Sequence, residues 1–593
     1  MRSSLVRFLR RVLLSPESRQ ELFLRTLYHR LNATSFSVHR QMRKAEASYR
    51  GWREQQSGLM NLPRIDADTT PGVTFLLEIG AGGEAAALAT IRSLQVMTGT
   101  NWHVVPVTAG SVGWDQLAAR LGWEERLFKP VSISEITLEL QESIDDAFVV
   151  FCQAGDLFLP TLLDEFAAAL IVSPSAGIIY TDCEYSKAGS DQFAPFFKPS
   201  ASSPELMLSV NYLSRSFVRA ASLSEFTARA TDLMSLEYAL QLGLVENNTV
   251  FHHVPRVLIS LCELPLVAEG AMHMALETHF ERRGAQNVVV QLISGQTRVN
   301  WDFGSPSASL VILSRNHGAW LRNLVDSIIT ITDYTNYSLV IVDNRSTEPE
   351  VLAYYDELAG NERVTLVHYD QPFNYSEAIN LGVAQSTADV VVLLNNDMLV
   401  TDAGWLHELV QWAVQPGIGV VGGKLLHRNN TIQHAGIILG MNGFIGHLYL
   451  NAPEHYHGLA GSVDWYRDLH AVTGACQAVR RALFLQVGGY DERFRLAFGD
   501  IDFCLRVVKA GCRTLYNPFA RLTHFEGGSR GYETPVNDIL LAYDELLPWV
   551  EKHDPYYSPN LTYQPIPQCN SQSGEVDARL KNIENRRRSL SKS

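Results

Sequence analysis

The stretch FNYSEAINLGVAQSTADVVVLLNNDMLV (Phe373–Val400) contains the order of elements that decides the fold. Tyr375–Gln385 is typical of a helix, and the apolar run Val390–Leu394 that follows has the length of a buried strand. This strand runs directly into Asn395-Asn396-Asp397. Ligands of open α/β sheets bind beyond the carboxyl ends of the strands, so the polar residues at this strand end are candidates for a binding site.

Strand-like and helical segments alternate on both sides of this stretch. Within the same region we expect helices at Trp320–Ile329 and Pro349–Leu358, and further strands at Leu310–Leu313, Leu339–Val342 and Val364–Val367. An earlier region, from about Gly72 to Asn300, alternates in the same way, with strand-like runs at Val73–Leu77, Phe148–Cys152 and Gly177–Tyr180. This alternation predicts an α/β fold with mostly parallel sheets.

The chain of 593 residues is too long for a single core, because single cores stop growing near ~250–300 residues. We therefore expect two large domains with appendages. The predicted division is a basic helical segment at 1–70, an α/β domain at 71–300, a second α/β domain at 301–560, and a polar, disordered tail at 561–593.

Composition excludes several classes of protein. Hydrophobic residues make up 46% and charged residues 19%, as in an ordinary soluble protein, and no apolar run reaches the ~18 residues of a membrane-spanning helix. The seven cysteines form no C-x-x-C pair, which argues against a disulfide framework or a zinc knuckle. Because no signal peptide is recognisable either, we expect a reducing, cytoplasmic location.

Charge divides the chain unevenly. Met1–Arg53 has twelve Lys or Arg and three acids, a net charge of +9, and the remaining residues sum to −23. An acidic body argues against nucleic acid as a partner. Within the basic segment one predicted helical face is apolar, with arginines opposite it: Leu5, Phe8, Leu9, Val12 and Leu13. Such a helix suits either peripheral contact with an anionic membrane surface or packing against the protein or a second subunit.

Three strand ends in the second region carry acids, amides or hydroxyls. Ser314 follows the first strand, Asp343 the second, and Asn395-Asn396-Asp397 the fourth. One aspartate could accept hydrogen bonds from a nucleobase or ribose while another holds a divalent cation, since Mg²⁺ often takes one or two carboxylates together with substrate phosphates. Taken singly, these residue types are also ordinary in turns.

Two further features carry possible chemistry. Asp500 and Asp502 stand in the first turn of a helix that ends at Gly511, and residues two apart do not share a helix face, so we expect one of the two to point into the site. Acids at a helix N-terminus can also be purely structural, because they favour the helix dipole. His524 precedes a Gly/Ser/Arg loop and could be a neutral imidazole ligand of a metal.

The order of these features resembles the inverting glycosyltransferases of family 2, which have the GT-A fold, and in particular the bacterial branch that builds surface polysaccharides. The resemblance covers Ser309 to Tyr532. It rests on stretches in the family's order: VILSRN (311–316), VIVDNRST (340–347), the opening stretch (373–400), AVTGACQAVRRALFLQVGGYDERF (471–494), FGDIDFCLRVVKAG (498–511) and LTHFEGGSRG (522–531). It implies two GT-A-like domains in tandem, of the Rossmann-like nucleotide-diphospho-sugar transferase type, after an N-terminal helical segment.

Carried over residue by residue, the resemblance implies roles. Asp343 would contact the base of a nucleotide sugar, and Asp397 and His524 would hold Mg²⁺ or Mn²⁺. Asp500 would deprotonate the acceptor hydroxyl, with Asp502 left as an alternative because Gly499 departs from the family pattern. Asn395 replaces the first acid of the family's Asp-x-Asp motif. The remaining donor-binding positions are Ser314, Asn395, Asn396, Gly474, Ala475 and Arg530.

The first region is similar to the same family, but it lacks most of the acidic residues of the family's motifs. FVVFCQAGDLFLPTLLDEFAAAL (148–170) and FFKPSASSPELMLSVNYLSRS (196–216) resemble the middle of a family-2 domain. Where the family has its Asp-x-Asp cluster, this region has Cys152-Gln153-Ala154-Gly155-Asp156, in which Asp156 alone remains. We expect a non-catalytic domain used for acceptor binding, membrane placement or dimerisation.

The function implied is metal-dependent transfer of a hexosyl or rhamnosyl group from a nucleotide-diphosphate sugar to a hydroxyl, with inversion. The acceptor would be a glycan or a lipid-linked oligosaccharide in O-antigen- or capsule-like polysaccharide synthesis. Metal would stabilise charge on the leaving diphosphate, and a carboxylate would take the acceptor proton. Two alternatives stay open, a two-site polysaccharide polymerase and a non-catalytic glycan-binding scaffold.

Overall fold

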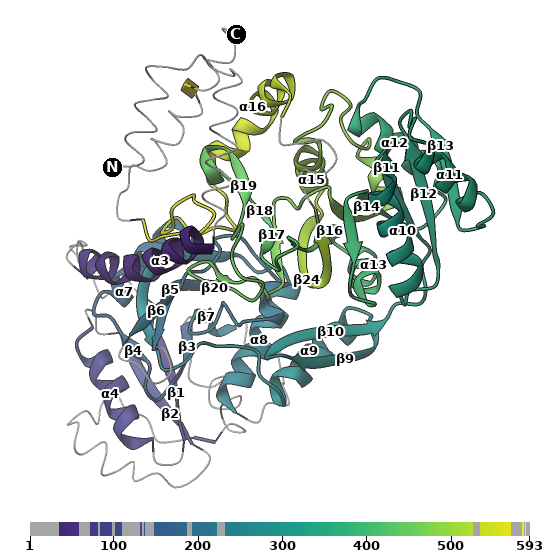
Figure 1. Ribbon diagram of the computed structural model, residues 1–593. Coiled ribbons are helices and arrows are strands. Elements are labelled where there is room, and N and C mark those ends of the chain that lie inside the picture. The colour runs from purple at the N-terminus through teal and green to yellow at the C-terminus, as the bar shows by residue number, and fades with distance from the viewer. Residues whose placement is uncertain are drawn as a thin grey trace.

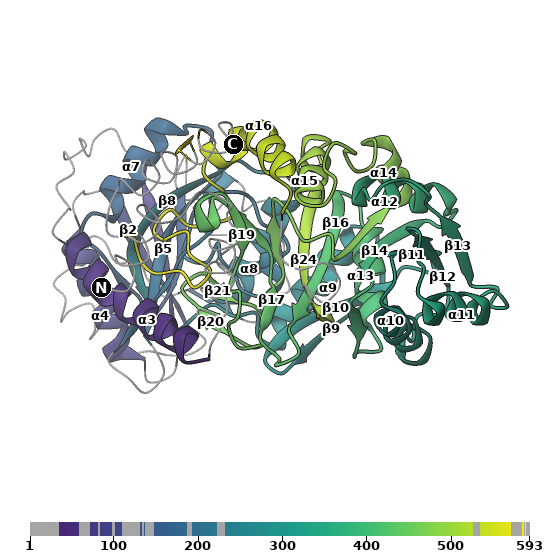
Figure 2. The same cartoon turned by 45° about the horizontal axis from the view of Figure 1, so that its top comes forward.

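The computed structural model describes residues 35–57, 71–80, 83–97, 101–108, 131–132, 136, 148–186, 192–221, 232–525, 534–570, 584–585 and 588 (Figure 1). Two sheet-centred parts lie side by side in Figure 2. We call residues 71–285 the first half and residues 308–525 the second half. An antiparallel hairpin of β9 (Gln286–Ile293) and β10 (Gln296–Asp302) connects them.

The first half is built on a sheet with the strand order β2-β1-β3-β7-β5-β8-β4, and β6 pairs with β5 outside this path. Its strands in chain order are β1 (Val73–Ile79), β2 (Trp102–Thr108), β3 (Phe148–Gln153), β4 (Leu157–Phe158), β5 (Ile178–Ser186), β6 (Phe193–Phe196), β7 (Phe217–Arg219) and β8 (Phe251–Leu261).

The second half is built on a sheet with the order β13-β12-β11-β14-β23-β16-β24-β15. Outside this path, β17 pairs with β16 and β22 pairs with β24. Its strands are β11 (Ala308–Ser314), β12 (Tyr337–Asp343), β13 (Val364–His368), β14 (Val390–Asn395), β15 (Met398–Val400), β16 (Ile418–Leu426), β17 (Ile432–His434), β22 (Arg467–Leu469), β23 (Cys476–Arg480) and β24 (Arg513–His524). Two small hairpins lie outside it, β18 (Ile437–Leu439) with β19 (Ile445–His447), and β20 (His457–Gly458) with β21 (Gly461–Ser462).

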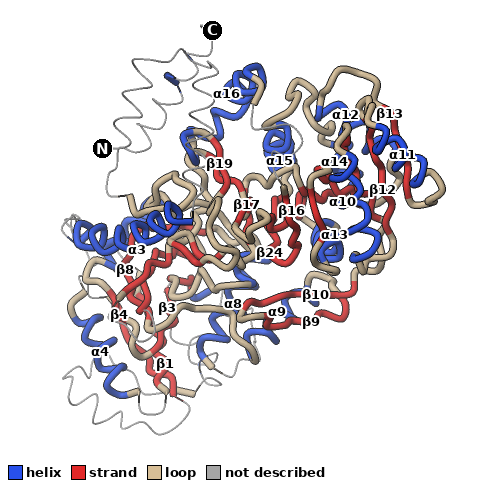
Figure 3. Tube along the Cα trace, in the orientation of Figure 1, coloured by secondary structure: helices blue, strands red, loops and turns tan. Residues whose placement is uncertain are grey.

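Both halves have one architecture. Without the edge strand β13, the second sheet reads β12-β11-β14-β23-β16-β24-β15, which matches the first sheet strand for strand. The strand directions match as well. β1–β3 and β11–β14 are parallel, β5–β8 and β16–β24 are parallel, and the short strands β4 and β15 run antiparallel to β8 and β24. The predicted fold class, two α/β domains of one kind in tandem, is therefore confirmed (Figure 3).

Helices flank these sheets, and the three predicted in the second region are present as α10, α11 and α12. The first half contains α4 (Glu84–Gln95), α7 (Leu162–Val172), α8 (Leu233–Glu246) and α9 (Ala271–Arg282). The second half contains α10 (Gly318–Ile331), α11 (Pro349–Leu358), α12 (Tyr375–Gln385), α13 (Trp405–Ala413), α14 (Arg481–Gln486) and α15 (Gly499–Lys509), and α16 (Val536–Glu551) follows it. Among the described residues, short 3₁₀ helices lie at Leu206–Leu208 and Met441–Gly443.

Local sequence explains where α11 and α12 begin. Pro349 is the first residue of α11, a position that lacks an intrahelical partner for its amide in any case. The Asn374 side chain accepts the Glu377 amide at 3.2 Å and caps α12. Gly382 lets α12 lie close to the sheet, because a Cβ there would approach the Val311 side chain to 2.5 Å. These contacts fix α12 beside the strand ends.

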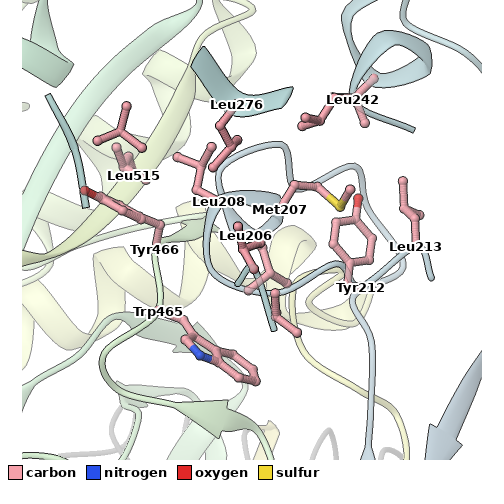
Figure 4. Close-up of a cluster of buried hydrophobic side chains, with 14 of the residues drawn as sticks. Leu206, Met207, Leu208, Tyr212, Leu213, Leu242, Leu276, Trp465, Tyr466 and Leu515 are labelled. Atoms are coloured by element: carbon pink, nitrogen blue, oxygen red, sulfur yellow. The ribbon is translucent and has the colours of Figure 1, made fainter. Parts of the chain in front are cut away.

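The two halves share one continuous apolar core. Leu206, Met207 and Leu208 of the first half lie beside Trp465, Tyr466 and Leu515 of the second (Figure 4). A buried ionic cluster adds to this junction. Arg513 donates to Asp468 at 2.6 Å and to Glu205, and Asp468 also accepts from the Ser203 hydroxyl. The second half is therefore held firmly against the first. The domain boundaries predicted from the sequence, 71–300 and 301–560, stay predictions.

Segments from both ends of the described chain pack on this body. The helix α3 (Ser35–Ser57) lies on the first half, where the Tyr49 hydroxyl donates to Glu184 at 2.6 Å. After α16, the Asn560 side chain donates to Asp182, and the Pro565 carbonyl accepts the Tyr449 amide. Packed chain thus continues to Asn570, beyond residue 561, where the sequence predicted a polar tail.

The predicted apolar face at Leu5–Leu13 lies outside the described residues. Within the part of the chain that the structure does describe, no helix is both long and apolar enough to span a membrane.

Candidate active site

Three predicted site residues meet at the carboxyl edge of the second sheet. In the parallel register, Ser314 of β11 lies opposite Asp343 of β12, and Leu313 lies opposite Asn395 of β14. The ends of three neighbouring strands therefore converge, as the sequence predicted. The Asn396 side chain also reaches the Ser314 hydroxyl, at 3.5 Å.

Asp343 is buried and held by several donors. Its Oδ1 accepts the Ser346 amide at 3.2 Å and the Tyr355 hydroxyl at 3.0 Å. His368 Nδ1 lies 3.8 Å from Oδ2. A carboxylate fixed in this way at a strand end has a set orientation and can accept hydrogen bonds from a planar polar group such as a nucleobase.

Asp397 and His524 face each other across two antiparallel strands. Met398 of β15 pairs with His524 of β24, and the Phe525 amide donates to the Asp397 carbonyl at 2.9 Å. The Asp397 carboxylate and His524 Nε2 are 3.2 Å apart, and both side chains are about 5% exposed. A pair that the sequence separates by more than a hundred residues is thus brought into contact.

This pair fits two positions on one divalent ion. Two ligands at right angles, each about 2.1 Å from an octahedral ion, lie about 3 Å from each other. Among the described residues no group of three or more His, Cys, Asp or Glu could hold a metal. In proteins Mg²⁺ commonly takes one or two side-chain ligands and completes its shell with substrate phosphates and water, an arrangement that two ligands at Asp397 and His524 would suit.

Asp500 lies at the Gly474–Ala475 turn. Its Oδ2 accepts the Gly474 amide at 2.7 Å, and its Oδ1 accepts the Ile501 amide at 3.0 Å. Burial raises the pKa of this carboxyl, while the two amides and His447 act against that rise. A Cβ at Gly474 would lie 2.9 Å from both the Asp500 Cβ and the Tyr490 hydroxyl, so the close contact requires glycine.

Asp502 is engaged elsewhere. Its carboxylate accepts Arg506 Nε at 2.7 Å, one turn along α15, and no contact joins it to the Gly474 turn in the described structure. Burial raises its pKa, and Arg506 opposes that rise. Of the two acids, Asp500 is the one that contacts the Gly474–Ala475 turn, and its role in the site stays a prediction.

Tyr375, which sequence reasoning did not single out, joins the two parts of the site. Its hydroxyl lies 3.2 Å from Asn395 Oδ1 and 3.4 Å from the Gly474 carbonyl. The Asn395 amide also donates to the Ala475 carbonyl at 3.1 Å. The strand-end cluster and the turn beside Asp500 are therefore directly adjacent.

Other contacts were missed for similar reasons. Tyr355 stands on the buried face of α11, where an aromatic residue is expected in the core whether or not it binds Asp343. His434 and His447 form a ring pair near the turn, and only the histidine content of this segment could have indicated them. Arg530, predicted to bind the donor, lies outside the described residues.

Comparison with known proteins gives one consistent group of matches. Residues 309–488 match the family described as "Glycosyl transferase family 2". The N-acetylglucosaminyl-diphospho-decaprenol L-rhamnosyltransferase of Mycobacterium tuberculosis is 42% identical over 246 residues, which cover 37% of this chain and 77% of that protein. The O-antigen biosynthesis protein RfbC of Myxococcus xanthus is 35% identical over 432 residues, covering 70% of this chain.

Coverage of the longer relatives is partial. The chain spans 34% of RfbC, and it spans 61% of the uncharacterized protein y4gI of Sinorhizobium fredii, to which it is 30% identical over 557 residues. Among solved structures, GalNAc-T7 with UDP, GalNAc and Mn²⁺ is similar at a TM-score of 0.35 and 17% identity, over 50% of this chain and 58% of that one.

Proposed function

The chain belongs to glycosyl transferase family 2, and from this premise we propose that its second half transfers a sugar from a nucleotide-diphosphate donor to an acceptor hydroxyl with inversion. The observation that carries the proposal is the adjacency of two kinds of group. Tyr375 and the Ala475 carbonyl join the strand-end cluster to the turn that binds Asp500. Inversion by one displacement needs a leaving-group site and a base on either side of one sugar ring.

Each residue of the site has a role in this proposal. Asp343 binds the nucleobase, helped by Ser314, and the amides of Asn395 and Asn396 line the path of the donor. Asp397 and His524 would hold a Mg²⁺ or Mn²⁺ ion, which supplies Lewis-acid stabilisation of the leaving diphosphate. Arg530 belongs to the proposal as a further diphosphate contact, on sequence grounds alone.

Asp500 is the proposed base. Gly474 and Ile501 hold both of its oxygens, so its orientation is set before an acceptor arrives. Partial burial raises the pKa of the carboxyl, and a higher pKa makes it a stronger proton acceptor for a hydroxyl. No covalent intermediate is needed, because the attacking hydroxyl displaces the diphosphate directly.

The acceptor is proposed as a glycan or lipid-linked oligosaccharide of bacterial surface polysaccharide. This rests on the names of the relatives, among them the O-antigen biosynthesis protein RfbC and the N-acetylglucosaminyl-diphospho-decaprenol L-rhamnosyltransferase, and it favours a rhamnosyl or other hexosyl donor. Action in the cytoplasm, with peripheral contact at the inner membrane, belongs to the same proposal. A two-site polymerase would need a second set of acids and ligands, and the corresponding position of the first half pairs Asp156 with an arginine.

The proposal is tested by nucleotide release. The full chain is incubated with a panel of nucleotide sugars, with Mn²⁺ or with chelator, and with an acceptor mixture containing lipid-linked saccharide. We expect one donor to raise the thermal unfolding midpoint in the presence of Mn²⁺ and to release its nucleotide only when acceptor is added. A chain that binds acceptor glycan but releases nucleotide from no donor would instead be a glycan-binding scaffold.

A further inference from the structure

A buried carboxylate of α16 holds the segment that leads into α15. Asp538, in the first turn of α16, is completely buried. One of its oxygens accepts the amides of Leu496 at 2.7 Å and of Ala497 at 2.8 Å, and the other accepts the amide of Arg495 at 3.3 Å. Three consecutive amides therefore meet one side chain, and the last of them is three residues before Asp500.

An acid in the first turn of a helix can be purely structural, because it favours the positive end of the helix dipole. Asp538 does more than that, because in the described structure its carboxylate binds the amides of residues 495–497 and none of the amides of α16. A buried charge is costly unless hydrogen bonds compensate it, and bonds to an ionised acceptor are stronger than neutral ones. The segment is thus fixed from the side of α16.

The other side of the same segment is bound to the start of α12. The Tyr375 amide donates to the Arg495 carbonyl at 2.7 Å, and the Ser376 hydroxyl donates to the Phe494 carbonyl at 2.6 Å. The hydroxyl of Tyr375 also lies 3.4 Å from the Gly474 carbonyl. The segment before α15 is therefore held between α16 and the end of α12 that borders the strand-end cluster.

Phe498, the last residue before α15, has a left-handed backbone conformation, with φ 67° and ψ −9°. This conformation is rare for a bulky residue and persists only where the surroundings enforce it. The Phe498 ring lies edge-on to Phe444 at 5.9 Å between centroids, and Phe444 packs on Tyr543 of α16 at 4.4 Å. The turn into α15 thus depends on α16 through Asp538 and through this aromatic contact.

The start of α15 decides where Asp500 lies. Gly499 packs against α12, because a Cβ there would come within 2.9 Å of the Ser376 hydroxyl oxygen. The next residue, Asp500, accepts the Gly474 amide at 2.7 Å. A Cβ at Gly474 would lie 2.9 Å from the Asp500 Cβ, so this contact leaves little room for a shift of α15.

We propose that Asp538 is a positioning residue for Asp500. Its carboxylate holds the amides of residues 495–497, and these set the left-handed turn at Phe498 and the start of α15. Asp500 is thereby brought to the Gly474 amide. The inference rests on the proposed function, since it takes Asp500 as the base. It gives α16, which lies outside the second sheet, a part in presenting that base.

The test begins with two substitutions of Asp538. Asp538→Ala leaves three amides without their acceptor, whereas Asp538→Asn keeps one carbonyl oxygen, which is enough for the two amides that share an oxygen now. Because a small displacement of a catalytic group can cost up to about a hundred-fold in rate, we expect kcat to fall roughly ten- to hundred-fold in Asp538→Ala and less than about three-fold in Asp538→Asn. Donor affinity, measured by calorimetry with the nucleotide sugar that the release assay selects, should stay unchanged in both.

A double-mutant cycle with Asp500→Asn separates positioning from a general structural role. If Asp538 acts through Asp500, Asp538→Ala should have little further effect on the residual rate of Asp500→Asn. Rates are compared at a temperature at which thermal unfolding shows every variant to be folded. Asp538→Glu keeps the charge but lengthens the side chain by one carbon, and it takes the place of Asp538→Ala in the cycle if that variant does not fold.

The matched control is Asp182→Ala in the first half. Asp182 is also completely buried and accepts a backbone amide, that of Lys198, at 2.9 Å. Its loss should lower the unfolding midpoint and leave kcat of the folded protein unchanged.

Two outcomes would overturn the inference. One is a wild-type kcat in folded Asp538→Ala; the other is an equal loss in the wild-type and Asp500→Asn backgrounds, which indicates a structural role. Asp500→Asn by itself separates these from failure of the proposed function. If Asp500→Asn transfers sugar at the wild-type rate, the assignment of the base is wrong and the inference falls with it. If Asp500→Asn loses transfer while folded Asp538→Ala keeps the wild-type rate, the inference alone is wrong.

Discussion

The two halves of the molecule place an aspartate at the same point of the same sheet and surround it differently. Asp397 follows β14 and precedes β15, and Asp156 follows β3 and precedes β4. Asp397 faces His524, with 3.2 Å between the carboxylate and Nε2. Asp156 instead accepts Arg215 Nε at 2.6 Å, with both side chains buried. In the first half, the aspartate is therefore paired with an arginine of the chain itself.

Arg215 is bound on several sides. Gln153 accepts its Nη2 at 2.8 Å, and Glu237 lies 3.6 Å from its Nη1. Burial raises the pKa of Glu237 to about 7, and Arg215 opposes the rise. α8 precedes β8 in the first half as α15 precedes β24 in the second, so these two helices correspond. The second residue of α8 is Met234, and the second residue of α15 is Asp500. The comparison teaches that one strand order can persist while a guanidinium lies beside the aspartate in the first half, where the second half has the proposed metal ligand His524, and while an apolar residue begins the helix that corresponds to the one with the proposed base.

Removing the proposed metal should produce the largest difference between the halves. Excess chelator, or Asp397→Ala, should abolish transfer, because the charge on the leaving diphosphate then lacks stabilisation worth several kcal/mol. Donor affinity measured by calorimetry should fall together with activity. Re-addition of Mn²⁺ should rescue the chelated wild type but not the variant. Undiminished transfer in chelator would remove Asp397 and His524 from the site.

Loss of the base should have the next largest effect. Asp500→Asn keeps the shape of the side chain but removes its basic oxygen, so the rate of transfer should fall by ~10²–10⁴. Nucleotide-sugar affinity should barely change, since the proposal places the donor on Asp343 and Asp397. Asp502→Asn is the control, and it should lose mainly stability, because its carboxylate binds Arg506. An inactive Asp502→Asn beside an active Asp500→Asn would reverse the assignment.

The corresponding change in the first half should leave chemistry intact. Asp156→Asn removes one partner of a buried ion pair, which typically lowers the free energy of unfolding by about 3 kcal/mol. Transfer by the folded fraction should match the wild type. The measurements are the denaturant midpoint and the specific activity at a temperature where the variant is folded. If the variant folds normally but loses transfer, the first half takes part in the reaction, as in a two-site polymerase.

The sequence predicted that the two halves share one architecture and that Asp156 alone remains in the first half. It did not predict the contact between Asp156 and Arg215. The predicted helices Pro349–Leu358 and Tyr375–Gln385 coincide with α11 and α12, because the residues that bound these helices act within one turn of the chain. The order of Asp343, Asp397, Asp500 and His524 was informative because a family pattern fixed it. Arg215 lies 59 positions from Asp156, and nothing local marks an arginine after Leu213-Ser214 as buried.

Long-range pairs explain the other omissions. Tyr375 and Gly474 are 99 positions apart, and the partners of a hydroxyl at that separation are decided by how strands pack. The His434–His447 contact depends on the β18–β19 hairpin, whose two short strands gave no periodic signal. Features set within one local element, and residues carried by the family pattern, were thus predictable, whereas the other contacts between two elements were not.

The first half also carries the basic helix α3, which gives it a different role to test. One face of α3 packs inward through Ala45, Tyr49 and Trp52. Its exposed face carries Arg40, Arg43, Lys44 and Arg50, on a protein whose net charge is −14. Figure 1 shows α3 on the outside of the first half, away from the strand ends of the second. Basic residues on such a surface attract anionic lipid headgroups.

The smallest effects should therefore appear in vesicle binding and leave transfer untouched. Deletion of Met1–Pro16 should weaken binding to phosphatidylglycerol vesicles while the fold and the donor site stay intact, because the residues removed precede α3. Arg43→Ala should weaken it by about 1 kcal/mol, roughly five-fold, which is typical of one basic residue near an anionic surface. Arg363→Ala, an exposed arginine of the second half, is the matched control and should bind as the wild type does. Equal binding by the truncated protein would indicate that the N-terminal segment packs on protein instead. Equal losses in Arg43→Ala and Arg363→Ala would show that vesicle attraction depends on overall charge, and the division of labour between the halves would then rest on the site chemistry alone.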